Sequence, residues 1–165
     1  MRHTMSILVE NQFGVLARVS GLFSARGYNI DSLCVAETEN PAVSRMTVVV
    51  RGDDKVLQQI EKQLKKLVET IEVTDLTGTS HVERELVMIR VKAAGKKRSE
   101  VIEIANIFRA KVVDLSPDFI VVEGTGSAGK IKAFIDMMHP FGIEELVRTG
   151  KIAIGRSLNN DTRGR

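Results

Sequence analysis

Hydrophobic and polar positions alternate along this chain with two different periods, and their order predicts its elements. Residues 4–10 have the composition of a strand. The segment after them predicts a helix, because its apolar residues share one face: Val15, Leu16, Val19, Leu22 and Phe23. Gly27 follows that face, and we expect it to end the helix in the left-handed conformation.

Two β-rich runs come next, at residues 28–37 and 43–51. The turn-forming residues 38–41 join them, which predicts an antiparallel pair. In the second run, apolar residues at 46, 48 and 50 alternate with Arg45, Thr47, Val49 and Arg51. We therefore expect one face of this strand to lie in the core and the other to be more open.

A second helix begins at Gly52-Asp53-Asp54, where acidic side chains suit the positive end of a helix dipole. Its expected buried stripe consists of Val56, Ile60, Leu64, Leu67 and Val68. Residues 71–76 then close the unit as a strand. This order predicts a ferredoxin-like sandwich, in which two helices cover one face of a four-stranded antiparallel sheet.

After a polar segment the same order begins again. We expect a second set of strands at 85–93, 111–115, 119–123, 143–147 and 151–154. Ser99 is expected to cap one helix and Ser127 to begin another that ends near Met138. The predicted division is a first domain at 1–77, a linker at 78–84, a second domain at 85–156 and a polar tail at 157–165. The fold class is therefore α+β, with two ferredoxin-like βαββαβ α/β sandwiches.

Composition narrows the possible functions. Cys34 is the only cysteine and the three histidines lie far apart, so neither a disulfide within the chain nor a metal site is expected. No apolar run is long enough to span a bilayer and the N-terminus lacks a signal-peptide core, so we expect a cytoplasmic protein without membrane contact. The first 76 residues carry 9 basic and 10 acidic side chains and the rest 15 and 11, too small a bias to predict nucleic-acid binding.

The segment Gly124 to Lys130 imitates a nucleotide-binding loop, because it fits G-x-G-x-x-G and the first seven positions of a P-loop. A P-loop needs Ser or Thr after its lysine, and Ile131 stands there. The remaining residues are also too few for the parallel sheet that either fold requires. We expect a glycine-rich loop with a Ser127 cap. No catalytic grouping of serine, histidine, cysteine or carboxylates stands out elsewhere.

Gly14 stands where the first helix should begin, so its missing Cβ leaves backbone N–H groups open to an anion. Asn11 and Asn29 would supply neutral hydrogen-bonding groups on either side of that opening. This pattern indicates a small pocket for a free carboxylate. The alternative is purely structural: Asn11 turns the chain, Gly14 allows close packing and Asn29 follows a helix cap.

Three stretches resemble the N-terminal ACT domain of the acetolactate synthase small, regulatory subunit: residues 10–19, 22–33 and 44–47. The run Arg26-Gly27-Tyr28-Asn29-Ile30-Asp31-Ser32-Leu33 is the most specific of them. The resemblance continues through residues 59–64 and 81–85 into the second domain. It implies a non-catalytic homodimer that activates a catalytic large subunit and confers feedback inhibition by valine in branched-chain amino acid synthesis.

In that family valine binds at the interface of two ACT domains. The resemblance implies that backbone N–H groups around Gly14, Val15 and Leu16 hold its carboxylate. Asn11 would help to fix the polar end of the ligand.

Asn29 and Ile30 of the facing subunit would complete this pocket. Gln59 would contact the large subunit, by analogy with the family. Thiamine diphosphate, magnesium and FAD are expected only in the large subunit, and none in this chain. Two alternatives stay open: a stand-alone amino-acid-sensing ACT protein that regulates another enzyme, and a small nucleotide-binding enzyme that uses Gly124 to Lys130.

Overall fold

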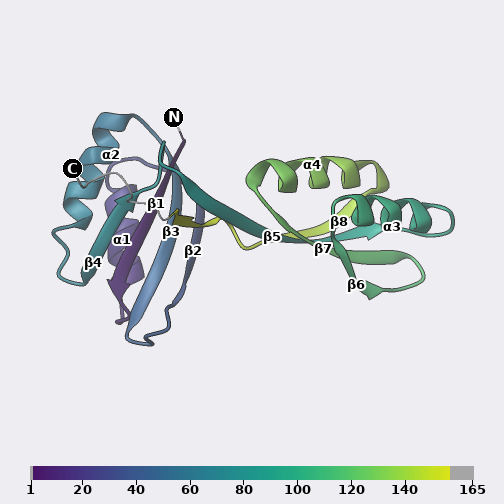
Figure 1. Cartoon of the computed structure of the whole chain (residues 1–165), viewed down its shortest axis with the longest axis horizontal. Helices are drawn as coiled ribbons and strands as arrows, with labels where there is room; N and C mark the ends of the chain where they lie inside the picture. The colour runs from purple at the N-terminus through teal and green to yellow at the C-terminus, as the bar shows by residue number, and fades with distance from the viewer. Residues whose placement is uncertain (1, 157–165) are drawn as a thin grey trace, which may run out of the picture. The chain divides into compact units, whose positions relative to one another are not determined.

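The computed structural model describes residues 2–156, apart from the side chain of Val56 (Figure 1). Within them the chain divides into two compact units. The first comprises residues 2–82 and 153–156, and the second comprises Glu83–Ile152. The predicted polar tail at 157–165 lies outside the described residues.

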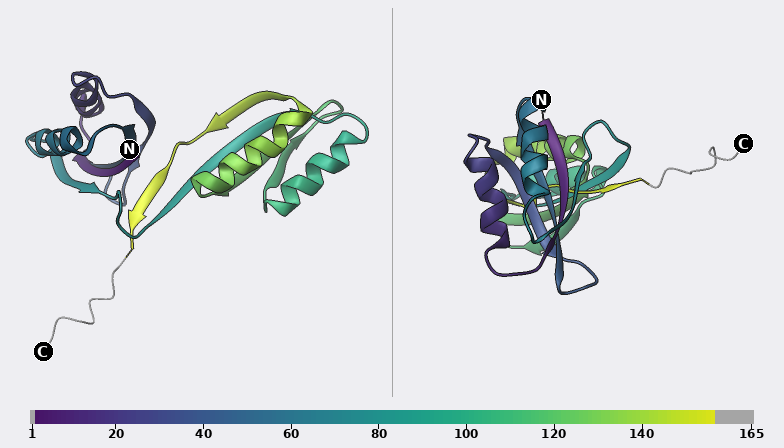
Figure 2. Two further views of the ribbon diagram at one scale, coloured as in Figure 1. Left: turned by 90° about the horizontal axis from the view of Figure 1, so that it is seen from above. Right: turned by 90° about the vertical axis from the view of Figure 1, so that its left-hand side faces the viewer.

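The first unit has the βαββαβ order that its hydrophobic periods predict. Its elements are β1 (Arg2–Glu10), α1 (Val15–Ser24), β2 (Ile30–Glu37), β3 (Val43–Arg51), α2 (Asp54–Leu64) and β4 (Thr70–Asp75). The strands form an antiparallel sheet in the order β2-β3-β1-β4, and α1 and α2 cover one of its faces (Figure 2). Strand β2 is therefore an edge of this sheet.

A core between the helices and the sheet holds this unit together. Its largest fully buried side chains are Phe23 from α1, Met5 and Ile7 from β1, Met46 from β3, and Ile60 and Leu64 from α2. Each buried side chain of this size contributes about 1.5–3 kcal/mol to folding. The left-handed Gly27, with φ 71°, turns the chain from α1 toward β2, as expected.

Two expectations about burial in this unit are wrong. Val68 is 92% exposed, because α2 ends at Leu64 and the helical period stops there; Leu57 is buried on the helix instead. Thr47 and Val49 are buried although they lie on the opposite face of β3 from the core. They pair with Ser6 and Thr4 of β1, so these side chains lie between neighbours on the two central strands.

The second unit repeats the order of elements. They are β5 (His81–Lys92), α3 (Lys97–Ile107), β6 (Lys111–Leu115), β7 (Phe119–Gly126), α4 (Ala128–Met138), the 3-10 turn η1 (His139–Phe141) and β8 (Ile143–Arg148). The first two residues of β5 belong to the first unit, and so does the last strand, β9 (Ile152–Gly155), apart from Ile152. The sheet order is β6-β7-β5-β8, with β9 also paired to β5. Phe134, Ile89, Ile120 and Ile131 are the largest fully buried side chains in its core. The two-sandwich fold class is confirmed.

Three boundaries in this unit differ from their expected places. Helix α3 begins at Lys97, so Ser99 lies inside it and its hydroxyl donates to the Lys96 carbonyl rather than capping the helix. Strand β7 continues to Gly126 because residues 119–126 all pair with β5. Residues 81–84, expected in the linker, are the start of β5.

Candidate functional site

Helix α1 begins without the side-chain cap that most helices have. Its first flanking residue is Gly14, at φ 81° and ψ −5°, and no side chain accepts a hydrogen bond from the first turn. Helices α2 and α4 differ, because Asp53 and Ser127 cap them through hydrogen bonds from Lys55 N and Lys130 N. The sequence of α1 thus leaves the positive end of its dipole open.

Two backbone donors at this helix start have no acceptor within the described part of the chain. Val15 N donates over 3.4 Å to the Gln12 carbonyl and Arg18 N donates to the Gly14 carbonyl. The N–H groups of Leu16 and Ala17 find no hydrogen-bond acceptor among residues 2–156. The first turn also contains no acidic residue that could serve as an internal anion. This geometry suits a carboxylate from outside the chain.

A cation lies beside the same opening, and it was not anticipated from the sequence. A Cβ added at Gly14 would lie 3.4 Å from Nη1 of Arg18. The other terminal nitrogen of Arg18 forms an ion pair with Glu69 at 2.5 Å, which holds the guanidinium in place. Arg18 therefore places a guanidinium beside the position where an incoming carboxylate would meet the helix, with Glu69 offsetting part of its charge.

Apolar side chains surround the helix start and remain exposed. Phe13 is fully exposed and Leu16 is 42% exposed, whereas Val15 is buried in the core. Both apolar side chains are therefore accessible to a molecule that covers the helix start.

Asn11 lies near Gly14 in the chain, and hydrogen bonds attach it to the end of β2 and the turn that follows β2. Its side-chain nitrogen donates to the Pro41 carbonyl at 2.9 Å and to Oε1 of Glu37 at 3.2 Å. Its backbone N–H donates to the Ala42 carbonyl. Asn11 thus has a structural role, and its side chain is exposed three residues before Gly14.

Asn29 and Ile30 do not lie on either side of this opening within one chain. Ile30 pairs with Val50, while Glu10, the residue before Asn11, pairs with Val43 at the other end of β3. These positions are seven residues apart on β3, which corresponds to about 23 Å at about 3.3 Å per residue. The structure of one chain therefore brings together Asn11, Gly14, Val15 and Leu16, but not Asn29 and Ile30.

Two arginines fix the backbone beside Ile30. Oδ2 of Asp31 accepts hydrogen bonds from Arg51 at 2.7 Å and from Arg2 at 2.9 and 3.2 Å. These bonds, first from Arg51 and then from Arg2, hold the pKa of Asp31 below its usual value. The start of β2 is thereby tied to the ends of β1 and β3.

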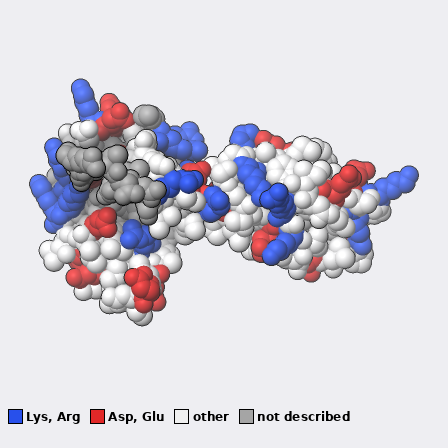
Figure 3. Space-filling model, viewed as in Figure 1, with Lys and Arg blue, Asp and Glu red and all other residues white. Residues whose placement is uncertain are grey.

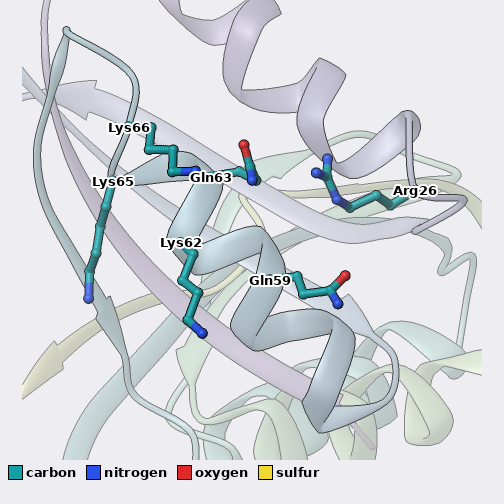
Figure 4. A pocket seen from close by; sticks show the side chains of 6 residues that line it. All are labelled: Arg26, Gln59, Lys62, Gln63, Lys65 and Lys66. Carbon is teal, nitrogen blue, oxygen red and sulfur yellow. The ribbon is translucent and has the colours of Figure 1, made fainter.

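Gln59 lies on α2, away from the start of α1 and from the start of β2. It lines a surface groove together with basic side chains of α2 and the turn after it, and with Arg26 (Figure 4). The groove was not anticipated from the sequence.

The segment Gly124 to Lys130 forms no phosphate-binding loop. Gly124 and Gly126 belong to β7, which pairs antiparallel with β5. The Lys130 amine donates to the Thr125 carbonyl, so its charge lies against the preceding strand. Ser127 caps α4 as expected.

Other kinds of site find no support in the described part of the chain. Residues 2–156 contain no group of three or more histidine, cysteine or carboxylate side chains placed to bind a metal ion. None of the helices in this range is both long enough and apolar enough to cross a bilayer.

Comparison with known families assigns each unit. The model of the AHAS small subunit-like ACT domain matches residues 5–72, and that of the small subunit of acetolactate synthase matches residues 84–157.

Individual relatives extend this similarity over almost the whole chain. A probable acetolactate synthase small subunit of Archaeoglobus fulgidus is 57% identical over 94% of this chain and 98% of its own. The acetolactate synthase small subunit of Aquifex aeolicus is 48% identical over 96% of this chain and 83% of its own. A crystal structure of the small subunit from Thermotoga maritima superposes with a TM-score of 0.86 at 40% identity, covering 94% and 98% of the two chains. The fold, the two family matches and these relatives agree: the chain belongs to the acetolactate synthase small subunit family.

Proposed function

We propose that this chain is the non-catalytic regulatory subunit of an acetolactate synthase, that it activates the catalytic large subunit, and that valine inhibits the complex through it. Membership of the small-subunit family supports the partner. Valine as the effector follows from the family resemblance and from the chemistry of the α1 entrance. Thiamine diphosphate, magnesium and FAD belong to the large subunit in this proposal.

The observation that carries the effector site is the uncapped start of α1. The unbonded N–H groups of Leu16 and Ala17 supply hydrogen bonds to a carboxylate, and the helix dipole and Arg18 supply positive charge. A helix start contributes about 0.3–1 kcal/mol per anion contact, and charge-assisted hydrogen bonds add to it. Exposed Phe13 and Leu16 offer an apolar wall to a branched side chain.

A second copy of the chain would supply the remaining residues. Strand β2 is an edge of its sheet, so it can pair with β2 of another copy. If the two strands pair antiparallel about their middles, Ile30 of the second copy lies opposite Glu37. Glu37 already contacts Asn11. Such a dimer would bring Asn29 and Ile30 of one copy to the Gly14 entrance of the other.

A pocket shared by two chains explains how a small ligand can regulate a large partner. Valine bound between two copies favours one relative placement of the copies over another. A ligand shifts an equilibrium only by the difference of its affinities for the two states. We propose that the large subunit is fully active with only one of these placements.

The test uses the purified chain, an acetolactate synthase large subunit and valine. We expect the chain to bind valine by calorimetry, to raise the rate of acetolactate formation, and to make that rate sensitive to valine. Valine binding without stimulation would point instead to a stand-alone amino-acid sensor of another enzyme. The proposal would be overturned if the chain bound neither the large subunit nor any branched-chain amino acid.

A further inference from the structure

A groove of about 520 Å³ lies on the helical side of the first unit, remote from the α1 entrance. Five of its residues come from α2 and the turn after it: Gln59, Lys62, Gln63, Lys65 and Lys66. Arg26 comes from the turn that follows α1, and it and Lys66 extend from opposite sides toward Gln63 (Figure 4). Two different elements thus contribute cations to one surface.

The groove carries positive charge that the described part of the chain does not neutralise. Among residues 2–156, no Asp or Glu lines it. Lys65 forms an ion pair with Glu61, but within residues 2–156 Arg26, Lys62 and Lys66 have no acidic partner. Basic side chains gather along this side of the unit, over α2 (Figure 3). Such a surface attracts and orients a negatively charged partner.

The helix dipole accounts for only part of this arrangement. Lysines near the end of a helix are favourable, which explains Lys62, Lys65 and Lys66 individually. It does not explain Arg26, which lies outside α2, or the two glutamines. Gln59 and Gln63 are one helical turn apart and present amide groups that can pair with a polypeptide backbone.

The chemistry favours an acidic polypeptide over a small phosphate ligand. Phosphate sites rely on free backbone N–H groups at helix starts, and this groove lies at a helix end. The N–H groups of Lys65, Lys66 and Leu67 donate to carbonyls of the last helical turn. What remains are long exposed cationic side chains with aliphatic stems, which suit carboxylates on another protein surface.

We propose that this groove docks an acidic segment of the catalytic large subunit, one that presents at least two carboxylates. The inference rests on the proposed function, since it names the surface through which that partner binds. Gln59 then contacts the large subunit as one member of a basic groove, and valine binds elsewhere, at the α1 entrance.

The experiment measures the affinity of the large subunit for the full-length small subunit by biolayer interferometry, at low and high salt. We compare wild type with Lys66→Glu and with the double variant Lys62→Glu/Lys66→Glu. Lys55→Glu is the matched control, because Lys55 is exposed on the same helix but does not line the groove. Valine binding to each isolated variant verifies that the fold and the effector site are intact.

We expect Lys66→Glu to weaken binding at least tenfold at low salt, the double variant to weaken it further, and Lys55→Glu to leave it within a factor of two. Wild-type binding should weaken as salt rises, and the double variant should lose most of that dependence. Equal affinities for all four proteins would overturn the proposal that the groove binds the large subunit, and they would leave the proposed function unchanged. No binding by the wild type would overturn both.

Discussion

Gly14 is the residue on which the proposed effector site depends most directly. Its φ of 81° lies in the region that residues with a Cβ avoid, at a cost of about 1 kcal/mol. The same missing side chain keeps the N–H groups of the first turn accessible. A single glycine thus sets both the entry of the chain into α1 and the access of an anion to it.

We predict that Gly14→Asp abolishes the response to valine while the large subunit is still activated. The new carboxylate would occupy the space and reverse the charge that the ligand meets. Calorimetry with valine and an acetolactate assay at rising valine concentration measure the two effects. Gly21→Asp is the control, since a Cβ at Gly21 on the same helix meets nothing within 4 Å. If Gly14→Asp lost both valine binding and activation of the large subunit, while Gly21→Asp kept both, the result would contradict a dedicated effector site.

Asp31 predicts a specific pH dependence of stability. Hydrogen bonds from Arg51 and Arg2 lower its pKa in the folded state. A lowered pKa means that the ionised form stabilises the fold above the unfolded pKa of about 4, and that this contribution is lost as pH falls through the folded pKa. In urea unfolding at pH 7, the free energy of unfolding of the wild type should exceed that of Asp31→Asn. This difference between the two proteins should shrink below about pH 4. A difference that stays constant down to pH 3 would exclude this assignment.

Arg18 shows what sequence patterns reveal and what they miss at this scale. Gly14 is recognisable because a glycine at an expected helix start is unusual. Arg18 had a usable signal too, since side chains of a helix point toward its N-terminus and residue i+4 lies over residue i. Its ion pair with Glu69 had no local signal, because these residues are 51 positions apart in the sequence.

Helix caps in the second unit provide a prediction at the scale of elements. Ser127 caps α4 by accepting a hydrogen bond from Lys130 N, whereas Ser99 lies inside α3. Ser127→Ala should lower the free energy of unfolding by about 1 kcal/mol, or about 4–8 °C in Tm for a unit of this size. Ser99→Ala should change it by only a few tenths of a kcal/mol. Thermal unfolding followed by circular dichroism measures both changes. Equal losses of stability in the two variants would show that the Ser127 cap stabilises the fold no more than Ser99 does.

Two glycines of the apparent nucleotide-binding motif should respond in opposite directions. A Cβ at Gly124 would lie 2.9 Å from Cε1 of buried Phe134, so Gly124→Ala should destabilise the unit by about 1–3 kcal/mol. A Cβ at Gly129 in α4 meets nothing within 4 Å, so Gly129→Ala should stabilise it by about 0.5–1 kcal/mol. Urea unfolding distinguishes these signs. Two losses of similar size would contradict this account of the packing at the two glycines.

The order of helices and strands can be predicted from this sequence because the periodic segments are long and glycine or proline separates them. The boundaries that differ have local causes. Lys96 is already in helical conformation after Gly95, whose φ is 59°, so α3 starts before its first good capping residue. Val68 follows the helical spacing but falls beyond the end of α2. A periodic pattern specifies a face, and it does not specify where the hydrogen bonding stops.

The separation of Gly14 from Asn29 matters only at the scale of the whole molecule. Within one chain about 23 Å of strand lies between their ends of the sheet, so no single copy can build the pocket that the family resemblance implies. No reading of one chain's periodicity could show this, because both residues flank the same helix in sequence. In the proposed dimer, edge strands pair across copies and would bring the two halves together.

Mixed dimers test that assembly directly. In the proposed pocket Gly14 comes from one copy and Asn29 from the other, so neither Gly14→Asp nor Asn29→Ala homodimers should bind valine with wild-type affinity. A dimer that combines one copy of each variant has one pocket with both changes and one pocket with neither. Refolding the two variants together should therefore restore tight valine binding, measured by calorimetry on the isolated mixed dimer, at half the wild-type stoichiometry. If the pocket were built within one chain, every site of the mixed dimer would keep one defect, and no tight binding would return.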